Sequence, residues 1–125
     1  MNSLPAGWRV LVIEDEMLVA MVVETMLSDI GCHVIGPFGR LAGALDAAER
    51  EQIDAALLDV NLHGEAVFPV ADALAKRGIP FVFMTGYGPE GLPKRFSDRP
   101  VLTKPYRSAA VLAALRALPD VHPVA

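Results

Sequence analysis

The segment PFVFMT, residues 80–85, places four consecutive bulky apolar residues between a proline and a threonine. An apolar run of this length without alternating polar residues is typical of a strand buried on both faces of a parallel sheet. Comparable segments recur along the chain as WRVLVIE (8–14), HVIG (33–36), DAALLDV (54–60) and PVLTK (100–104). These five segments predict a five-stranded sheet with helices on both faces.

Helical patterns separate the predicted strands. The first extends from about Met17 to Ile30 and ends at Gly31, and Ser108 is expected to cap the last one. Two others cover residues 41–51 and 69–77. The alternation predicts an α/β chain with the flavodoxin-like, doubly wound fold and strand order 2-1-3-4-5. Between the last two strands, residues 86–99 contain three glycines and two prolines, so a fourth helix there should be short or irregular.

Composition limits the kind of protein. The 125 residues, 53% of them hydrophobic, suit one packed domain, expected over residues 8–118 with tails at 1–7 and 119–125. No apolar run reaches the roughly 18 residues that cross a bilayer, so no membrane partner is expected. Cys32 is the single cysteine, which favours a reducing, cytoplasmic compartment. The net charge of -4 and the lack of a basic cluster argue against nucleic-acid binding.

Polar residues stand where the predicted strands end. Taken singly, each has an ordinary explanation as a helix cap, a turn residue or a surface charge. Ends of parallel strands meet at one edge of the sheet, however, and crowded carboxylates repel each other unless a cation is present. Carboxylates, Mg²⁺, an ammonium and a hydroxyl together can bind a phosphoryl group. The residues concerned are Glu14, Asp15, Glu16, Asp59, Thr85 and Lys104.

The motifs VLVIEDE (10–16), LLDVNL (57–62), FMTG (83–86) and TKP (103–105) resemble, in this order and spacing, the receiver domain of two-component response regulators. The resemblance covers about residues 8–118. It implies that Asp59 is the phospho-acceptor and also a ligand of one Mg²⁺ ion. It further implies that Asp15 binds this ion directly, that Glu14 holds it through water, and that the backbone carbonyl of Asn61 is another ligand.

The same resemblance gives roles to the other strand-end residues. Lys104 is expected to pair with the phosphoryl oxygens, and Thr85 to move inward and hydrogen-bond the phosphoryl group. Pro105 is expected to form a cis peptide with Lys104 that aims the lysine. His63 follows the acceptor closely and is expected to line the site.

The chain departs from the usual receiver pattern in one respect. Val101 stands where classical receivers have a strand-five aromatic, and Tyr106 follows the KP pair instead. FMTGYG (83–88) resembles the FATGUY subfamily, with Met84 in place of its alanine. The switch is therefore expected at Gly86, Tyr87 and Gly88 together with Tyr106, with activation ordering residues 86–99.

The first predicted helix carries apolar residues on two sides. Its core face is expected to consist of Val19, Val22, Val23, Met26, Leu27 and Ile30. Met17, Leu18 and Met21 fall toward the polar side. They are either scattered exposed apolar residues or a docking patch for a histidine kinase or a histidine phosphotransfer protein.

The expected function is that of a stand-alone receiver, a monomer or weak homodimer, which signals by protein binding, phosphate shuttling or as a phosphate sink. It would act as an enzyme only on its own phosphorylation and dephosphorylation. One alternative is a Mg-dependent phosphotransferase or phosphatase of the haloacid-dehalogenase kind, but Asn61 stands where those enzymes need a second Asp. Another alternative is a pseudo-receiver that binds partners without phosphorylation.

Overall fold

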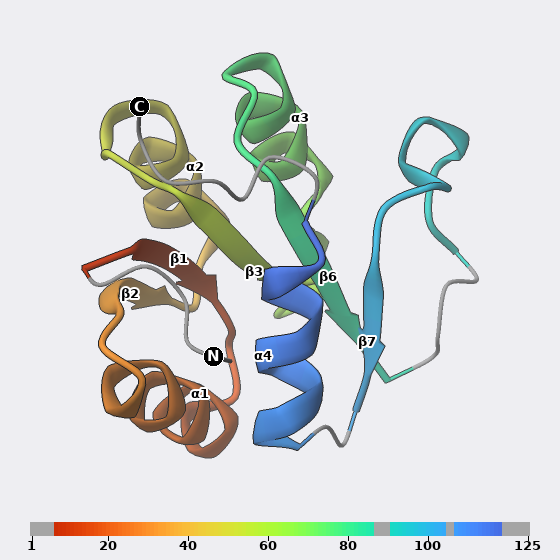
Figure 1. Ribbon diagram of the computed structural model, residues 1–125. Helices are drawn as coiled ribbons and strands as arrows, with labels where there is room; N and C mark the ends of the chain where they lie inside the picture. Colours follow the sequence, from red (N-terminus) through yellow and green to blue (C-terminus); the bar gives the residue numbers. More distant parts are fainter. Residues whose placement is uncertain (1–6, 87–90, 105–106, 119–125) are drawn as a thin grey trace.

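A computed structural model describes residues 7–86, 91–104 and 107–118 of the chain (Figure 1). Parallel strands alternate with helices along the chain, as the apolar runs predict. The elements, in chain order, are β1 (Arg9–Ile13), α1 (Met17–Asp29), β2 (His33–Phe38), α2 (Leu41–Arg50), β3 (Ala55–Asp59), β4 (Asn61–Leu62), β5 (Glu65–Ala66), α3 (Phe68–Lys76), β6 (Phe81–Thr85), the 3₁₀ helix η1 (Lys94–Phe96), β7 (Val101–Thr103) and α4 (Ser108–Arg116).

The main sheet has five parallel strands in the order β2-β1-β3-β6-β7. Because β6 and β7 are the fourth and fifth parallel strands along the chain, this order is the predicted 2-1-3-4-5. The flavodoxin-like, doubly wound fold is thereby confirmed. The small antiparallel hairpin of β4 and β5, which follows the central strand β3 directly, was not predicted.

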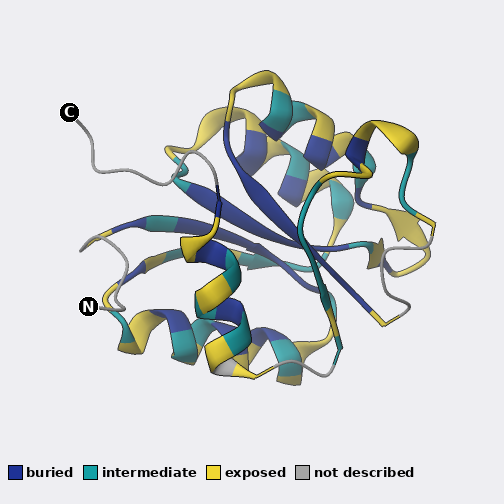
Figure 2. Cartoon of the chain, turned by 45° about the vertical axis from the view of Figure 1, so that its right-hand side comes forward, coloured by how far each residue is buried: buried dark blue, intermediate teal, exposed yellow. Residues whose placement is uncertain are grey.

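Helices cover both faces of the sheet, which explains why its strands are continuously apolar (Figures 1 and 2). Leu11, Leu58 and Phe83 pack with α2 and α3 in one core. Their neighbours Val12, Leu57 and Val82 pack with α1 and α4 in the other. Alternate residues of each strand therefore belong to different cores, and β1, β3 and β6 have no solvent-facing side.

An aromatic cluster ties the connection between β6 and β7 to the sheet. Phe96 of η1 is buried, and its ring lies 5.5 Å from Phe83, 5.8 Å from Phe81 and 6.1 Å from Phe68, measured between centroids. Its neighbour Arg95 donates two hydrogen bonds to the carboxylate of Asp72 on α3. Within the described part of this connection, η1 is the one helical segment, as expected for an irregular fourth helix.

Two expectations about helices are wrong. Val22 is exposed rather than part of the core face of α1, whose buried residues are Ala20, Val23 and Leu27. Positions 20, 23 and 27 form a narrow stripe that a small alanine completes, and Val22 lies about 100° away from Val23. Helix α4 begins at Ser108, so Arg107, and not the predicted Ser108, occupies its N-cap position.

In the described ranges, no helix has the length and apolar character to span a membrane.

Candidate functional site

The carboxyl ends of four neighbouring strands bring the predicted site residues to one edge of the sheet. Glu14 and Asp15 follow β1, Asp59 ends β3, Thr85 ends β6 and Lys104 follows β7. A cavity of about 690 Å³ opens there. Its walls include the predicted residues Asp15, Asp59, Asn61, His63, Thr85, Gly86 and Lys104, together with Glu16, Val60 and Leu92.

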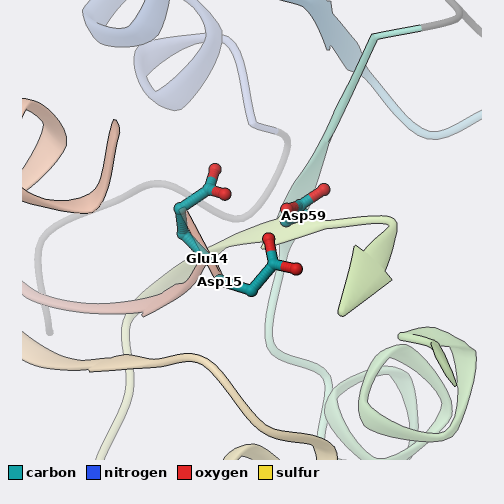
Figure 3. A group of neighbouring side chains, drawn as sticks. All are labelled: Glu14, Asp15 and Asp59. Carbon is teal, nitrogen blue, oxygen red and sulfur yellow. The ribbon is translucent and has the colours of Figure 1, made fainter. Parts of the chain in front are cut away.

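Three carboxylates converge at this edge (Figure 3). Glu14, Asp15 and Asp59 each offer an oxygen, and the three oxygens lie within 4.8 Å of one another. The side chains of Glu14 and Asp59 are 0% and 7% exposed, whereas that of Asp15 is 17% exposed. Water can therefore screen the mutual repulsion of the two buried carboxylates only weakly.

Backbone amides hold each of these carboxylates in place. The N–H of Glu16 donates to Glu14 Oε2 at 3.1 Å, and the N–H of Asn61 lies 3.3 Å from Asp59 Oδ1. The N–H of His63 donates to Asp15 Oδ2 at 2.8 Å. The site is thus oriented by the main chain that leaves β1 and β3, with little dependence on flexible side chains.

The β4–β5 hairpin sits beside Asp15 and sets the position of Asn61. His63 and Gly64 form its two-residue turn with positive φ angles of 50° and 86°, the conformation that a tight hairpin requires. The side chain of Asn61 accepts a hydrogen bond from the N–H of Gly64 at 2.8 Å. The pair His63-Gly64, which begins at the fourth residue after the buried strand β3, is the sequence signal that could have revealed this hairpin.

Lys104 contacts three carboxylates at once. Its Nζ lies 3.2 Å from Glu14 Oε1, 3.4 Å from Asp59 Oδ2 and 3.1 Å from Glu16 Oε1. Its backbone N–H donates to the carbonyl of Thr85 at 2.8 Å, which ties the end of β7 to the end of β6. From the sequence, Glu16 is one of the strand-end acids but has no predicted role of its own.

Burial and charge shift the proton affinities of the site. Burial, followed by the neighbouring Glu14 carboxyl, raises the pKa of Asp59 to about 8, although Lys104 acts in the opposite direction. Burial alone would lower the pKa of Lys104, but the hydrogen bond to Glu16 and the charges of Asp59 and Glu14 outweigh it and raise that pKa. Burial alone would raise the pKa of Asp15. The hydrogen bond from the His63 amide, with smaller contributions from its neighbours, outweighs burial and lowers that pKa.

The donor set suits a hard divalent cation. Glu14 Oε1 is buried and accepts no hydrogen bond, although it lies next to the Lys104 ammonium. Burial and the neighbouring Glu14 raise the pKa of Asp59 despite the nearby Lys104 ammonium, so a further positive charge would favour the ionised carboxylate. Closely grouped carboxylate oxygens with access to water are the environment that Mg²⁺ prefers. The acidic cluster of Glu14, Asp15 and Asp59 therefore fits a magnesium ion.

The predicted switch and docking residues lie around this centre. Thr85 is buried at the end of β6, and Gly86 lines the cavity. Met17, Leu18 and Met21 are 76%, 77% and 55% exposed on α1, and they line no part of the cavity. The remaining predicted switch residues, Tyr87, Gly88, Pro105 and Tyr106, lie outside the described residues, as does the expected cis bond between Lys104 and Pro105.

A doubly wound sheet with an acidic, lysine-bearing cavity at its carboxyl edge is the CheY-like fold. Sequence comparison makes the assignment definite, because residues 10–116 match the family model described as the response regulator receiver domain. The chain belongs to this family.

The chain is similar to regulatory proteins of bacteria. The transcriptional regulatory protein PdtaR of Mycobacterium tuberculosis is 28% identical over 111 residues, which are 86% of this chain and 54% of PdtaR. The phyllosphere-induced regulator PhyR of Methylorubrum extorquens is 31% identical over 116 residues, 86% of this chain and 42% of PhyR. The chain thus spans about half the length of these relatives, or less.

A solved structure matches over almost its whole length. The solution structure of SdrG from Sphingomonas melonis Fr1 is 47% identical, with a TM-score of 0.80, and the match covers 91% of this chain and 98% of SdrG. The BeF3-activated conformation of SdrG, recorded from Pseudomonas melonis Fr1, is 46% identical with a TM-score of 0.72 and covers 90% and 98% of the two chains.

Proposed function

We propose that the domain, residues 8–118, accepts a phosphoryl group on Asp59 from the phosphohistidine of a sensor kinase or a histidine phosphotransfer protein, in a reaction that needs one Mg²⁺ ion. The observation that carries this proposal is the setting of Asp59. Its carboxylate lies at the centre of the cavity edge, with Lys104 Nζ 3.4 Å from one oxygen and the Asn61 amide 3.3 Å from the other. A buried carboxylate held in this way is suited to act as a nucleophile.

In the proposed reaction, an ionised oxygen of Asp59 attacks the phosphorus atom. The new O–P bond forms as the P–N bond to the imidazole breaks, and the imidazole nitrogen keeps the electron pair. Lys104 lies where an ammonium can pair with the oxygens of the transferred group. Because burial and Glu14 raise the pKa of Asp59 to about 8, the positive charge of a bound cation would favour the ionised form of this nucleophile near neutral pH.

Mg²⁺ would be held by Asp15, Asp59 and the backbone carbonyl of Asn61, with Glu14 acting through water. The ion would supply the charge that neutralises the carboxylates and the incoming phosphoryl oxygens. The chain itself prepares these ligands, because the amides of His63 and Glu16 orient Asp15 and Glu14. We propose that the domain catalyses only its own phosphorylation and dephosphorylation and acts on no separate substrate.

The phosphorylated state would be read through Thr85 and the residues that follow it. Thr85 is proposed to hydrogen-bond the phosphoryl group, and residues 86–99 are proposed to become ordered in response, with Tyr87 and Tyr106 serving in place of the missing strand-five aromatic. Val101 is half-buried beside Phe83, so this strand offers no aromatic ring at that position. Phe96 and Arg95 anchor the far end of the segment to Phe83 and to Asp72. The BeF3-activated state of the similar SdrG supports a comparable activation here.

An apolar patch on α1 is proposed to receive the phosphate donor. It consists of Met17, Leu18, Met21 and, as the structure adds, Val22, all of them more than half exposed. Helix α1 begins directly after the acidic residues Glu14, Asp15 and Glu16. A helix of the donor packed on this patch would therefore lie close to Asp59. We propose that the domain works in the cytoplasm as a monomer or weak homodimer and passes the signal to a downstream protein.

Acceptance of phosphate can be tested without the natural donor. The wild type is incubated with acetyl phosphate with and without Mg²⁺, next to Asp59→Ala, and the intact mass is measured. The expected result is a gain of one phosphoryl group that requires both Asp59 and Mg²⁺. Asp46→Asn is the matched control, because Asp46 is an exposed residue of α2 outside the cavity and should leave the gain unchanged. A wild type that gains no mass, or an Asp59→Ala variant that gains it equally, would contradict the proposal.

A further inference from the structure

Glu16 is the least constrained of the three carboxylates around Lys104. Its Oε1 lies 3.1 Å from Lys104 Nζ, yet its side chain is 63% exposed, whereas those of Glu14 and Asp59 are almost fully buried. The backbone of Glu16 is fixed at both sides, because its N–H donates to Glu14 Oε2 and its carbonyl accepts from Ala20 at 2.9 Å. The main chain of Glu16 is therefore fixed, whereas its carboxylate reaches the lysine from an exposed position.

The three N–H donors of Lys104 are already matched by three carboxylates. An ammonium has three N–H donors, and three carboxylates lie within 3.4 Å of Nζ. A phosphoryl group on Asp59 would bring further anionic oxygens to the same nitrogen. Glu14 is fully buried and cannot turn away, so the contact with Glu16 is the one that can be given up.

The charge of Glu16 also acts directly on the site. The exposed Glu16 lines the same cavity as Asp59 and Lys104, and a phosphoryl group on Asp59 would place a second negative charge next to the same ammonium. Two anions that share one cation at short distance repel each other, and the repulsion is reduced but not removed at a partly exposed position.

The geometry points to Glu16 as a positioning residue that competes with the phosphoryl group for Lys104. In the unphosphorylated protein Glu16 holds the ammonium at the cavity edge, and it weakens the binding of a phosphoryl group at Asp59. The role rests on the proposed function, since Lys104 is taken there to pair with the phosphoryl oxygens. Glu16→Gln should free the lysine and strengthen that binding.

The hold on Lys104 can be measured without metal or phosphate. The chain has three lysines, and Lys76 and Lys94 are exposed, so they serve as internal references in NMR spectra of the side-chain Cε and Nζ nuclei. We expect the Lys104 Nζ signal to shift, and its amine protons to exchange faster with water, in Glu16→Gln. Glu65→Gln, which removes an exposed charge from the nearby strand β5, is the matched control and should leave the signal in place. An unchanged Lys104 signal in Glu16→Gln would overturn the inference.

The competition is measured with beryllofluoride, a phosphoryl mimic, titrated in the presence of Mg²⁺ and followed by calorimetry. Glu16→Gln is expected to bind it roughly threefold to tenfold more tightly than the wild type, and Glu65→Gln within about twofold of it. Equal or weaker binding by Glu16→Gln overturns the role of Glu16. A wild type that binds no beryllofluoride overturns the proposed function instead. In that case the metal-free NMR result still tests the contact between Glu16 and Lys104.

Discussion

Replacing Asp59 by Asn should stabilise the metal-free protein, even though Asp59 is the proposed centre of function. The carboxyl lies in a site that disfavours its charge, with a pKa raised from 3.8 to about 8 by burial and by Glu14. A group whose pKa is raised on folding binds more protons in the folded state, so stability falls as pH rises between the two pKa values. Because Asn carries no charge, the stability of the variant should not fall with pH in this way.

The size of the effect follows from the same shift. About four pKa units at about 1.4 kcal/mol each set an upper limit of about 6 kcal/mol. The nearby Lys104 ammonium and solvent that reaches the open cavity reduce this limit, and we expect ~2 kcal/mol at pH 8. For a domain of this size the gain corresponds to a rise in melting temperature of roughly 5–10 °C.

Urea unfolding of the wild type and of Asp59→Asn, in a chelator and at several pH values, measures the difference directly. The free energy of unfolding of the variant, relative to that of the wild type, should increase from about pH 4 to pH 8, and the difference should then level off. Mg²⁺ should stabilise the wild type by binding to its folded state and have little effect on the variant. Asp46→Asn removes an exposed carboxylate paired with Arg50 and should change stability by less than about 0.5 kcal/mol. A difference that stays constant with pH, or a variant less stable than the wild type at pH 8, would refute the reasoning.

Three further results are expected. Phe96→Ala should lower the free energy of unfolding by ~3 kcal/mol, measured in urea, because it empties the centre of the aromatic cluster; a loss below 1 kcal/mol would show that η1 is not anchored there. Leu18→Glu should slow phosphotransfer from the donor protein at least tenfold while acetyl phosphate labels it normally, and an unchanged rate would exclude the patch on α1. Amide exchange of residues 86–99 should slow on adding beryllofluoride, and equal protection in both states would contradict ordering of this segment.

Most of the fold could be predicted because its signals are local. A strand such as Phe81–Thr85 is apolar at every position, since both of its faces are covered, and this pattern is visible in any short window of sequence. The order of strands then follows from the doubly wound topology. The hairpin of β4 and β5 was missed because its strands have two residues each, too few for an alternating pattern. Val22 was placed wrongly because Ala20, and not Val22, is buried on α1 together with Val23 and Leu27.

The sequence by itself determined which chemical groups are available and at which strand ends they stand: three acids after the first strand, Asp59, Thr85 and Lys104. Only the tertiary structure decided how these groups share their charges. Lys104 lies 88 residues or more from the acids of the first strand, and it meets Glu14 and Glu16 because β1, β3, β6 and β7 lie side by side. Ion pairing and burial depend on distances in space, so the raised pKa of Asp59 and the hold of Glu16 on the lysine have no counterpart in the local sequence.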